Sequence, residues 1–206
     1  MPKLFHLSCS PRGASESAAG ARAFVDAFRA ARPNWDVDVM DLWRDHLPEF
    51  DGSALGAKYA RMGGRAFDDS EREAFAVIER IAIRFALADR VLISTPMWNF
   101  GVPYKLKQWF DLVMQPGLSF RFDPAQGYLP LFKNRPTLVV MASGGDFVTG
   151  MNRGRTDMAS PYIREALRFI GVSDVRFVPI GPTQGPQAPA ARETAHRRLA
   201  EMGTRF

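Results

Sequence analysis

The alternation of strand-like and helix-like segments is the feature that most restricts how this chain can fold. Five short apolar or alternating runs each precede a stretch with helical spacing, and they cover residues 3–9, 35–42, 90–95, 136–142 and 174–180. Strands separated by helices require crossover connections, which produce a parallel sheet with helices on both faces. We therefore predict an α/β fold with a five-stranded parallel sheet, for which the strand order 2-1-3-4-5 is common.

The length of the chain suits a single domain over residues 1–206. Two segments depart from the alternation. Residues 43–69 contain several glycines, and we expect a loop-rich excursion with some helix there. Residues 115–134 are expected to form a loop-rich insertion that carries aromatic side chains.

Short motifs also predict where two of the helices begin and end. Ser70 is expected to cap a helix that starts at Glu71, with Glu73 completing a capping box. Ser160 is expected to cap a later helix that Gly171 closes.

Composition excludes several classes of protein. Hydrophobic residues make up 46% of the chain, enough for a core without disulfide bonds, and Cys9 is the single cysteine. A reducing, cytoplasmic compartment is therefore expected. The formal charge is +5, but the basic residues are scattered, so we predict no nucleic-acid partner. No apolar run approaches the ~20 residues that span a bilayer, so we predict no membrane partner either.

The loop after the first predicted strand has the chemistry of a phosphate site. Small polar residues lead directly into a helix N-terminus, where backbone N–H groups and the helix dipole favour an anion. The carboxylate of Glu16 must point away from a phosphate bound there, and a serine-rich helix cap is the simpler alternative. The candidate cofactor-binding residues in this loop are Ser10, Arg12, Ser15, Glu16 and Ser17.

Two further loops follow the third and fourth predicted strands, and we expect them to meet the first loop at one end of the sheet. The third strand leads into residues 96–103, where large apolar side chains are combined with two prolines and a glycine, a surface on which a flat ring can lie. A hydrophobic lid is the alternative there. The fourth strand leads into a double-glycine loop, which permits close backbone approach to a ligand or simply forms a tight turn. The candidates in these loops are Pro96, Met97, Trp98, Asn99, Phe100, Ser143, Gly144 and Gly145.

Other kinds of active site find little support in the sequence. The three histidines, His6, His46 and His196, lack the spacing of metal ligands. Cys9 has no activating partner nearby in the sequence, and Ser143 is not part of a G-x-S-x-G motif. A metal site and a covalent hydrolase are therefore disfavoured.

Taken together, these segments resemble the FMN-dependent NAD(P)H:quinone oxidoreductases and azoreductases, which have a flavodoxin-like fold. The resemblance covers nearly the whole chain in the same order. Its most specific part is the run PMWNFGVP at 96–103 followed by LKQWFD at 106–111. Weaker matches are the serine loop, GLSF at 117–120, GYLP at 127–130, Ser143-Gly144-Gly145 and FIGV at 169–172.

The resemblance implies a fold, a cofactor and a reaction. The fold would be a flavodoxin-like three-layer sandwich. FMN would be bound non-covalently, with its phosphate in the serine loop and its ring on residues 96–100 and on the glycine loop. NAD(P)H would reduce the flavin and leave, and a quinone or azo compound would then take two electrons, which is a ping-pong cycle whose chemistry belongs to the cofactor. No side chain is expected to be catalytic.

The family also implies a homodimer with active sites at the subunit interface. Phe120 would then reach the flavin of the partner subunit, and Asp146 and Phe147 would lie where substrates bind. The glycine loop departs from the family pattern, in which an Arg precedes the two glycines and a His or Tyr follows soon after. Here Ser143 precedes them and Asp146 follows, so a carboxylate near the ring is expected to alter hydride affinity or acceptor choice.

Three rival functions stay open at the level of sequence. A flavin or nitro reductase would use the same cofactor with another acceptor. A flavodoxin-like electron carrier would have no substrate of its own, although such carriers are usually acidic and this chain is basic. A domain that has lost its flavin would follow if Glu16 and the altered glycine loop prevent binding.

Overall fold

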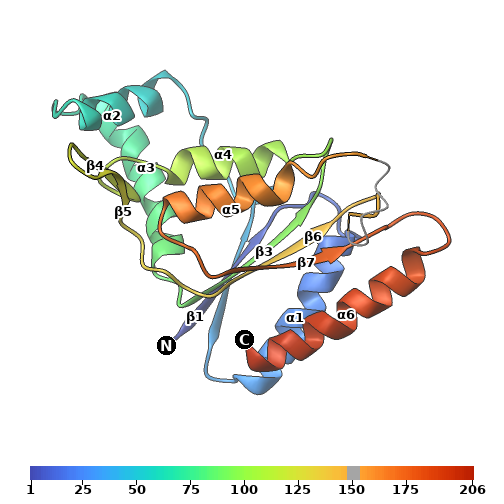
Figure 1. The fold of residues 1–206 in the computed structure, drawn as a ribbon. Coiled ribbons are helices and arrows are strands. Elements are labelled where there is room, and N and C mark those ends of the chain that lie inside the picture. The colour runs from blue at the N-terminus through green and yellow to red at the C-terminus, as the bar shows by residue number, and fades with distance from the viewer. Residues whose placement is uncertain (148–153) are drawn as a thin grey trace.

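A computed structural model describes residues 1–147 and 154–206 and shows one central parallel sheet (Figure 1). The order of its strands is β2-β1-β3-β6-β7, which confirms the predicted order 2-1-3-4-5 when only these five strands are counted. The strands are β1 (Lys3–Ser8), β2 (Asp36–Asp41), β3 (Arg90–Pro96), β6 (Thr137–Ala142) and β7 (Val175–Ile180).

Helices cover both faces of this sheet, as Figure 1 shows. One face carries α1 (Glu16–Ala31) and α6 (Ala188–Arg205), and the other carries α3 (Asp69–Ala86), α4 (Tyr104–Val113) and α5 (Ala159–Phe169). Two buried clusters fill the spaces between the layers because alternate strand residues point to opposite faces. In β1, for example, Phe5 and Leu7 belong to the larger cluster and Leu4 to the smaller one. Among the described residues, none of the helices is both long and apolar enough to cross a membrane.

The two segments that departed from the alternation both contain regular structure. Helix α2 (Gly52–Met62) lies within residues 43–69, where some helix was expected. An antiparallel hairpin of β4 (Phe120–Asp123) and β5 (Gly127–Pro130) lies within residues 115–134, which the sequence had suggested to be mainly loop. Packing explains the hairpin, since the rings of Phe120 and Tyr128 lie 5.0 and 5.6 Å from the ring of Phe169 on α5.

The predicted caps of α3 and α5 were wrong by a few residues. Asp68 caps α3 and forms the capping box with Glu71, while the Ser70 hydroxyl only donates to the Asp68 carboxylate. At α5 the Asp157 carboxylate accepts the N–H groups of Ala159 and Ser160, so Ser160 is already inside the helix. In both cases a nearby aspartate displaces the predicted serine, because a carboxylate accepts N–H bonds more strongly than a hydroxyl. Gly171 does follow α5 with a φ of 106°, as predicted.

Helices α1 and α6 pack closely because glycines face the contact. A Cβ atom on Gly203 of α6 would overlap the Phe24 carbonyl oxygen of α1 and lie 3.0 Å from the Ala27 Cβ. The backbone oxygen cannot move without disturbing α1, so a side chain at this position is not accommodated.

We expect Gly203→Ala to lower the free energy of unfolding by about 1–3 kcal/mol, because the added methyl group overpacks the contact. Gly52→Ala is the matched control, since a Cβ there meets nothing within 4 Å. This control should keep or raise stability, because alanine favours helix over glycine by up to about 1 kcal/mol. Urea unfolding measures both variants, and equal stabilities would contradict the close packing of α1 and α6.

Candidate functional site

The three candidate loops leave the same edge of the sheet. Strand β3 lies between β1 and β6, with Ser8 paired to Ser94 and Pro96 paired to Ala142. Beyond these pairs, the Cys9 N–H donates to the Ser94 oxygen at 2.9 Å, and the Met97 N–H donates to the Ala142 oxygen at 2.7 Å. The serine loop, residues 96–103 and the glycine loop are therefore neighbours at the carboxyl end of the sheet.

The serine loop holds its hydroxyl groups in place around the start of α1. Ser15 is the N-cap of α1, and its Oγ lies 2.9 Å from the Oγ of Ser17. Both serines are buried, whereas Ser10 is half-buried and Arg12 is exposed. The Arg12 N–H approaches the Ser10 hydroxyl at 3.4 Å. A helix N-terminus with buried hydroxyls and an exposed guanidinium can hold an anion such as a phosphate.

Glu16 is turned toward α6 by an ion pair. Its two carboxylate oxygens lie 2.8 Å from Nε and 2.6 Å from a terminal nitrogen of Arg192. This is a two-point contact between α1 and α6, which fits the expectation that the carboxylate points away from an anion in the serine loop.

Residues 98–101 form a tight turn with an unusual backbone. Trp98 and Gly101 exchange both backbone hydrogen bonds, at 3.0 and 2.9 Å. The two central residues, Asn99 and Phe100, have φ values of 48° and 70°, as a type I′ turn requires. Positive φ is common for Asn but costs energy for a bulky Phe, and such strain concentrates at functional sites.

This turn offers two backbone donors at its tip. Among the described residues, the N–H groups of Asn99 and Phe100 find no hydrogen-bond acceptor. The Phe100 oxygen accepts the Met158 N–H at 2.9 Å, which ties the turn to the start of α5. The two N–H groups are thus held in position and available to a polar ligand.

An aromatic cluster stands beside the turn and includes a residue that the sequence analysis missed. The Trp43 ring lies 5.8 Å from the Trp98 ring and 5.3 Å from the Tyr104 ring. The Trp43 Nε1–H donates to the Cys9 oxygen at 3.1 Å. Trp43 follows β2, whose carboxyl end lies at the same edge of the sheet, and that position was the signal available in the sequence.

The glycine loop is shaped by backbone contacts. The Ser143 hydroxyl donates to the Gly145 oxygen at 2.9 Å, and the Ser143 oxygen accepts the Thr183 N–H at 3.0 Å. A Cβ on Gly145 would lie 3.0 Å from the Arg155 guanidinium and 3.3 Å from the Phe147 ring. Gly145 therefore has little room for a side chain, and Phe147 packs close to the loop.

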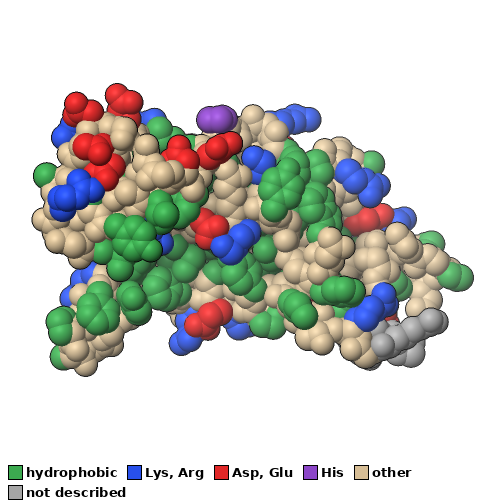
Figure 2. All heavy atoms as spheres, turned by 90° about the horizontal axis from the view of Figure 1, so that it is seen from above, with side chains coloured by type: hydrophobic (Ala, Val, Ile, Leu, Met, Phe, Trp, Pro, Cys, Tyr) green, Lys and Arg blue, Asp and Glu red, His purple; other side chains and the backbone are tan. Residues whose placement is uncertain are grey.

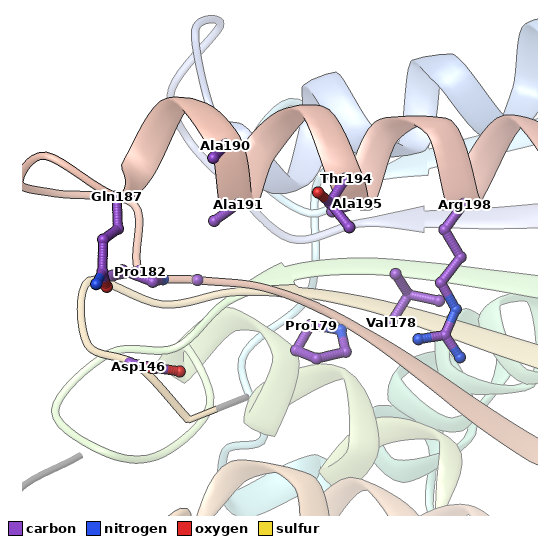
Figure 3. Close-up of a pocket in the computed structure, with 11 residues that line it drawn as sticks. Asp146, Val178, Pro179, Pro182, Gln187, Ala190, Ala191, Thr194, Ala195 and Arg198 are labelled. Carbon is purple, nitrogen blue, oxygen red and sulfur yellow. The ribbon is translucent and has the colours of Figure 1, made fainter. Parts of the chain in front are cut away.

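Asp146 lies on the side of this loop that faces α6. It lines a pocket of about 380 Å³ between β7 and α6, together with Pro182 and Gln187, and Arg198 lies at the opposite end (Figure 3). The structure therefore places Asp146 beside α6, and its proposed role in substrate binding stays a prediction.

Phe120 is not brought to the three loops within one chain. It belongs to the hairpin of β4 and β5, which Figure 1 shows on the opposite side of the molecule from the loop after β6. The implied contact of Phe120 with a flavin would need a second subunit.

Two titratable groups under the site, the half-buried His6 and the buried Cys9, are kept in their neutral forms near pH 7. His6 Nε2 lies 2.9 Å from the Ser94 hydroxyl, and burial lowers the pKa of His6 to about 4, although the nearby Asp41 opposes this shift. Burial raises the pKa of the Cys9 thiol, and Asp41 adds to that effect. A thiol kept protonated is a poor nucleophile. No group of three or more His, Cys, Asp or Glu side chains suited to a metal ion occurs in the described part of the chain.

Comparison with known proteins identifies the family. A family profile described as a flavodoxin-like fold matches residues 2–202. The FMN-dependent NADH:quinone oxidoreductase 1 of Bradyrhizobium diazoefficiens is 72% identical to the chain over 208 aligned positions, which cover 100% of both proteins. The chain belongs to the family of FMN-dependent NADH:quinone oxidoreductases. This confirms the resemblance seen in the motifs of the serine loop and of residues 96–111.

Other members of this family and of the fold are also similar. The FMN-dependent NADH:quinone oxidoreductase 2 of Burkholderia lata is 42% identical, covering 99% of this chain and 100% of its own. An azoreductase from Bacillus anthracis superposes with a TM-score of 0.90 at 24% identity, covering 100% of both chains. An FMN-dependent NADH-azoreductase from the same species, solved in complex with FMN, superposes with a TM-score of 0.87 at 23% identity, covering 100% of this chain and 99% of its own. At such identities the two structures establish the shared fold.

The depressed pKa of His6 predicts how stability depends on pH. Above the unfolded pKa of about 6.5 the imidazole is neutral in both states, so stability is fully present. As the pH falls from there toward about 4, only the unfolded state takes up the proton, and the free energy of unfolding falls by up to about 3 kcal/mol.

Urea unfolding of the wild type and of His6→Gln, at about pH 7 and about pH 4.5, measures this contribution. The wild type should lose more stability than the variant between the two values. Parallel losses would show that His6 titrates normally in the folded protein.

Proposed function

We propose that this chain is an FMN-dependent oxidoreductase that passes two electrons from NADH to a quinone. The observation that carries the proposal is the tip at Asn99 and Phe100, whose two N–H groups lie at the same edge of the sheet as a serine-capped helix N-terminus. That pair of features suits a molecule with a flat polar ring and a phosphate tail. The relatives named above, including one of 72% identity over the whole chain, support the assignment of FMN, NADH and quinone.

The serine loop suits the phosphate of FMN. Ser10, Ser15 and Ser17 supply hydroxyl donors, and Arg12 is exposed and free to swing toward an anion. The first N–H groups of α1 add donors, because a helix leaves them without partners of its own. The Glu16 carboxylate is already paired with Arg192, so the loop accepts a dianion without a competing charge at that position.

Residues 96–100 and the glycine loop suit the ring of FMN. When bound, FMN supplies the chemistry, since it can accept a hydride and deliver two electrons to an acceptor. In our proposal the Asn99 and Phe100 N–H groups donate to polar atoms of the ring and stabilise negative charge there. Gly144 and Gly145 line another edge of the ring, and Pro96, Met97 and Trp98 form an apolar support that keeps water away.

The aromatic side chains near the turn suit planar substrates. Phe100 and Tyr104 are exposed, and the tilted rings of Trp43 and Trp98 lie beside them. A nicotinamide and a quinone are both planar, so we propose that they occupy this surface in turn, in a ping-pong cycle. NADPH as a second donor and azo compounds as alternative acceptors belong to the same proposal, and Phe147 is proposed as a substrate contact.

We also propose that the protein is a homodimer. Figure 2 shows apolar side chains gathered in a band on the face that carries α2, α4 and α5. Exposed apolar residues include Leu55, Tyr59 and Met62 on α2 and Tyr104 on α4, and the hairpin of β4 and β5 adds Phe122 and Tyr128. Extended apolar patches on soluble proteins commonly mark interfaces, and a second copy placed there would bring Phe120 of the partner subunit toward the site.

The function is tested by the colour and the redox behaviour of the purified protein. We expect a yellow protein that NADH bleaches without oxygen and that a simple benzoquinone reoxidises. A protein that FMN cannot reconstitute would support a domain without flavin, and a yellow protein that neither NADH nor NADPH reduces would support a carrier. Rapid reduction with no transfer to quinones or azo dyes, but transfer to free flavin or nitro compounds, would favour the reductase alternative.

The turn at Asn99 gives a sharp mutational test. Asn99→Pro removes one N–H donor and imposes a negative φ where the turn has 48°, so we expect the rate of NADH-dependent quinone reduction to fall at least about tenfold. Asn99→Gly is the matched control, because glycine keeps the N–H and accepts positive φ. The glycine variant should retain most of the activity in a steady-state assay. Equal rates for the two variants would remove this turn from the site.

A further inference from the structure

The ion pair between Glu16 and Arg192 lies next to the proposed phosphate site. Glu16 is the first residue of α1 and directly follows the N-cap Ser15. Arg192 lies on α6 and contacts the Glu16 carboxylate through two nitrogens, at 2.8 and 2.6 Å. The exposed fractions of the two side chains are 26% for Glu16 and 42% for Arg192, so the pair is partly shielded from solvent.

A carboxylate at this position competes with a bound phosphate when it is not paired. Negative side chains in the first turn of a helix are drawn to its N-terminus, where the same N–H groups would hold the phosphate. Two anions in one small site also repel each other. The serine loop therefore contains a residue that opposes its proposed ligand, and Arg192 is the group that contacts it.

We propose that Arg192 is a positioning residue for FMN binding, which acts by holding the Glu16 carboxylate over α6 and neutralising it. The proposal rests on the function proposed above. Arg192 needs no contact with the cofactor in this account, because its effect passes through Glu16. The ion pair would explain how a phosphate dianion can bind in a serine loop that also contains an acidic residue.

The test measures the FMN dissociation constant of the apoprotein by flavin fluorescence. Arg192→Ala should weaken binding about five- to tenfold, because it leaves an unpaired charge near the phosphate. Glu16→Gln should bind FMN at least as tightly as the wild type, and the double variant should regain wild-type affinity. Arg197→Ala is the control, because Arg197 is an exposed arginine on the same helix. This variant should bind FMN as the wild type does.

Salt dependence separates an electrostatic role from a structural one. The effect of Arg192→Ala should shrink between about 50 mM and about 500 mM salt, because screening weakens the repulsion. Arg192→Gln serves the same test if the alanine variant does not fold.

Three results would overturn the proposal. The first is a Glu16→Gln variant as weak as Arg192→Ala, since the pair would then only join two helices. The second is a double variant that stays weak, since Arg192 would then act directly. The third is unchanged affinity in Arg192→Ala. A wild-type protein that binds no FMN at all would instead refute the proposed function, so the two failures can be told apart.

Discussion

The parallel pairing of β1, β3 and β6 is the constraint on which the rest of the structure depends. Strand β3 lies between the other two, and their registers bring Ser8, Ser94, Pro96 and Ala142 to one edge of the sheet. Because parallel strands all end at the same edge, three loops far apart in the sequence become neighbours there. A shift of one residue in either pairing would turn every side chain of the shifted strand to the other face and move its loop by about 3.3 Å along the strand direction.

The candidate site is built mainly from backbone. Hydrogen bonds from Met97 to Ala142, from Met158 to Phe100 and from Thr183 to Ser143 tie its loops to one another and to the sheet. The type I′ turn stores strain at Phe100 and directs two N–H groups outward. Such a site can bind and orient a cofactor without reactive side chains, which agrees with the neutral states of His6 and Cys9.

The sequence predicted the fold well because the spacing of apolar residues indicates which face of each strand or helix is buried. The five strands followed from the alternating patterns, their order was expected because it is common in such sheets, and the structure confirms both. Errors occurred where two local signals competed or where packing supplied the energy. Asp68 and Asp157 precede the predicted caps Ser70 and Ser160, and each helix begins earlier because these carboxylates accept its first free N–H groups. The hairpin at residues 120–130 depends on contacts with Phe169, which is about forty residues further along the chain.

The sequence by itself determined the order of the elements, the serine cap of α1 and the family to which the chain belongs, because these depend on residues close together in the chain. Only the tertiary structure decided that Trp43 stands against Trp98, that Asp146 faces α6, and that Arg192 pairs with Glu16 across 176 positions. Side-chain direction and long-range charge pairing depend on how the layers pack. Short sequence patterns do not predict that packing, because it depends on the shapes of many residues from different elements.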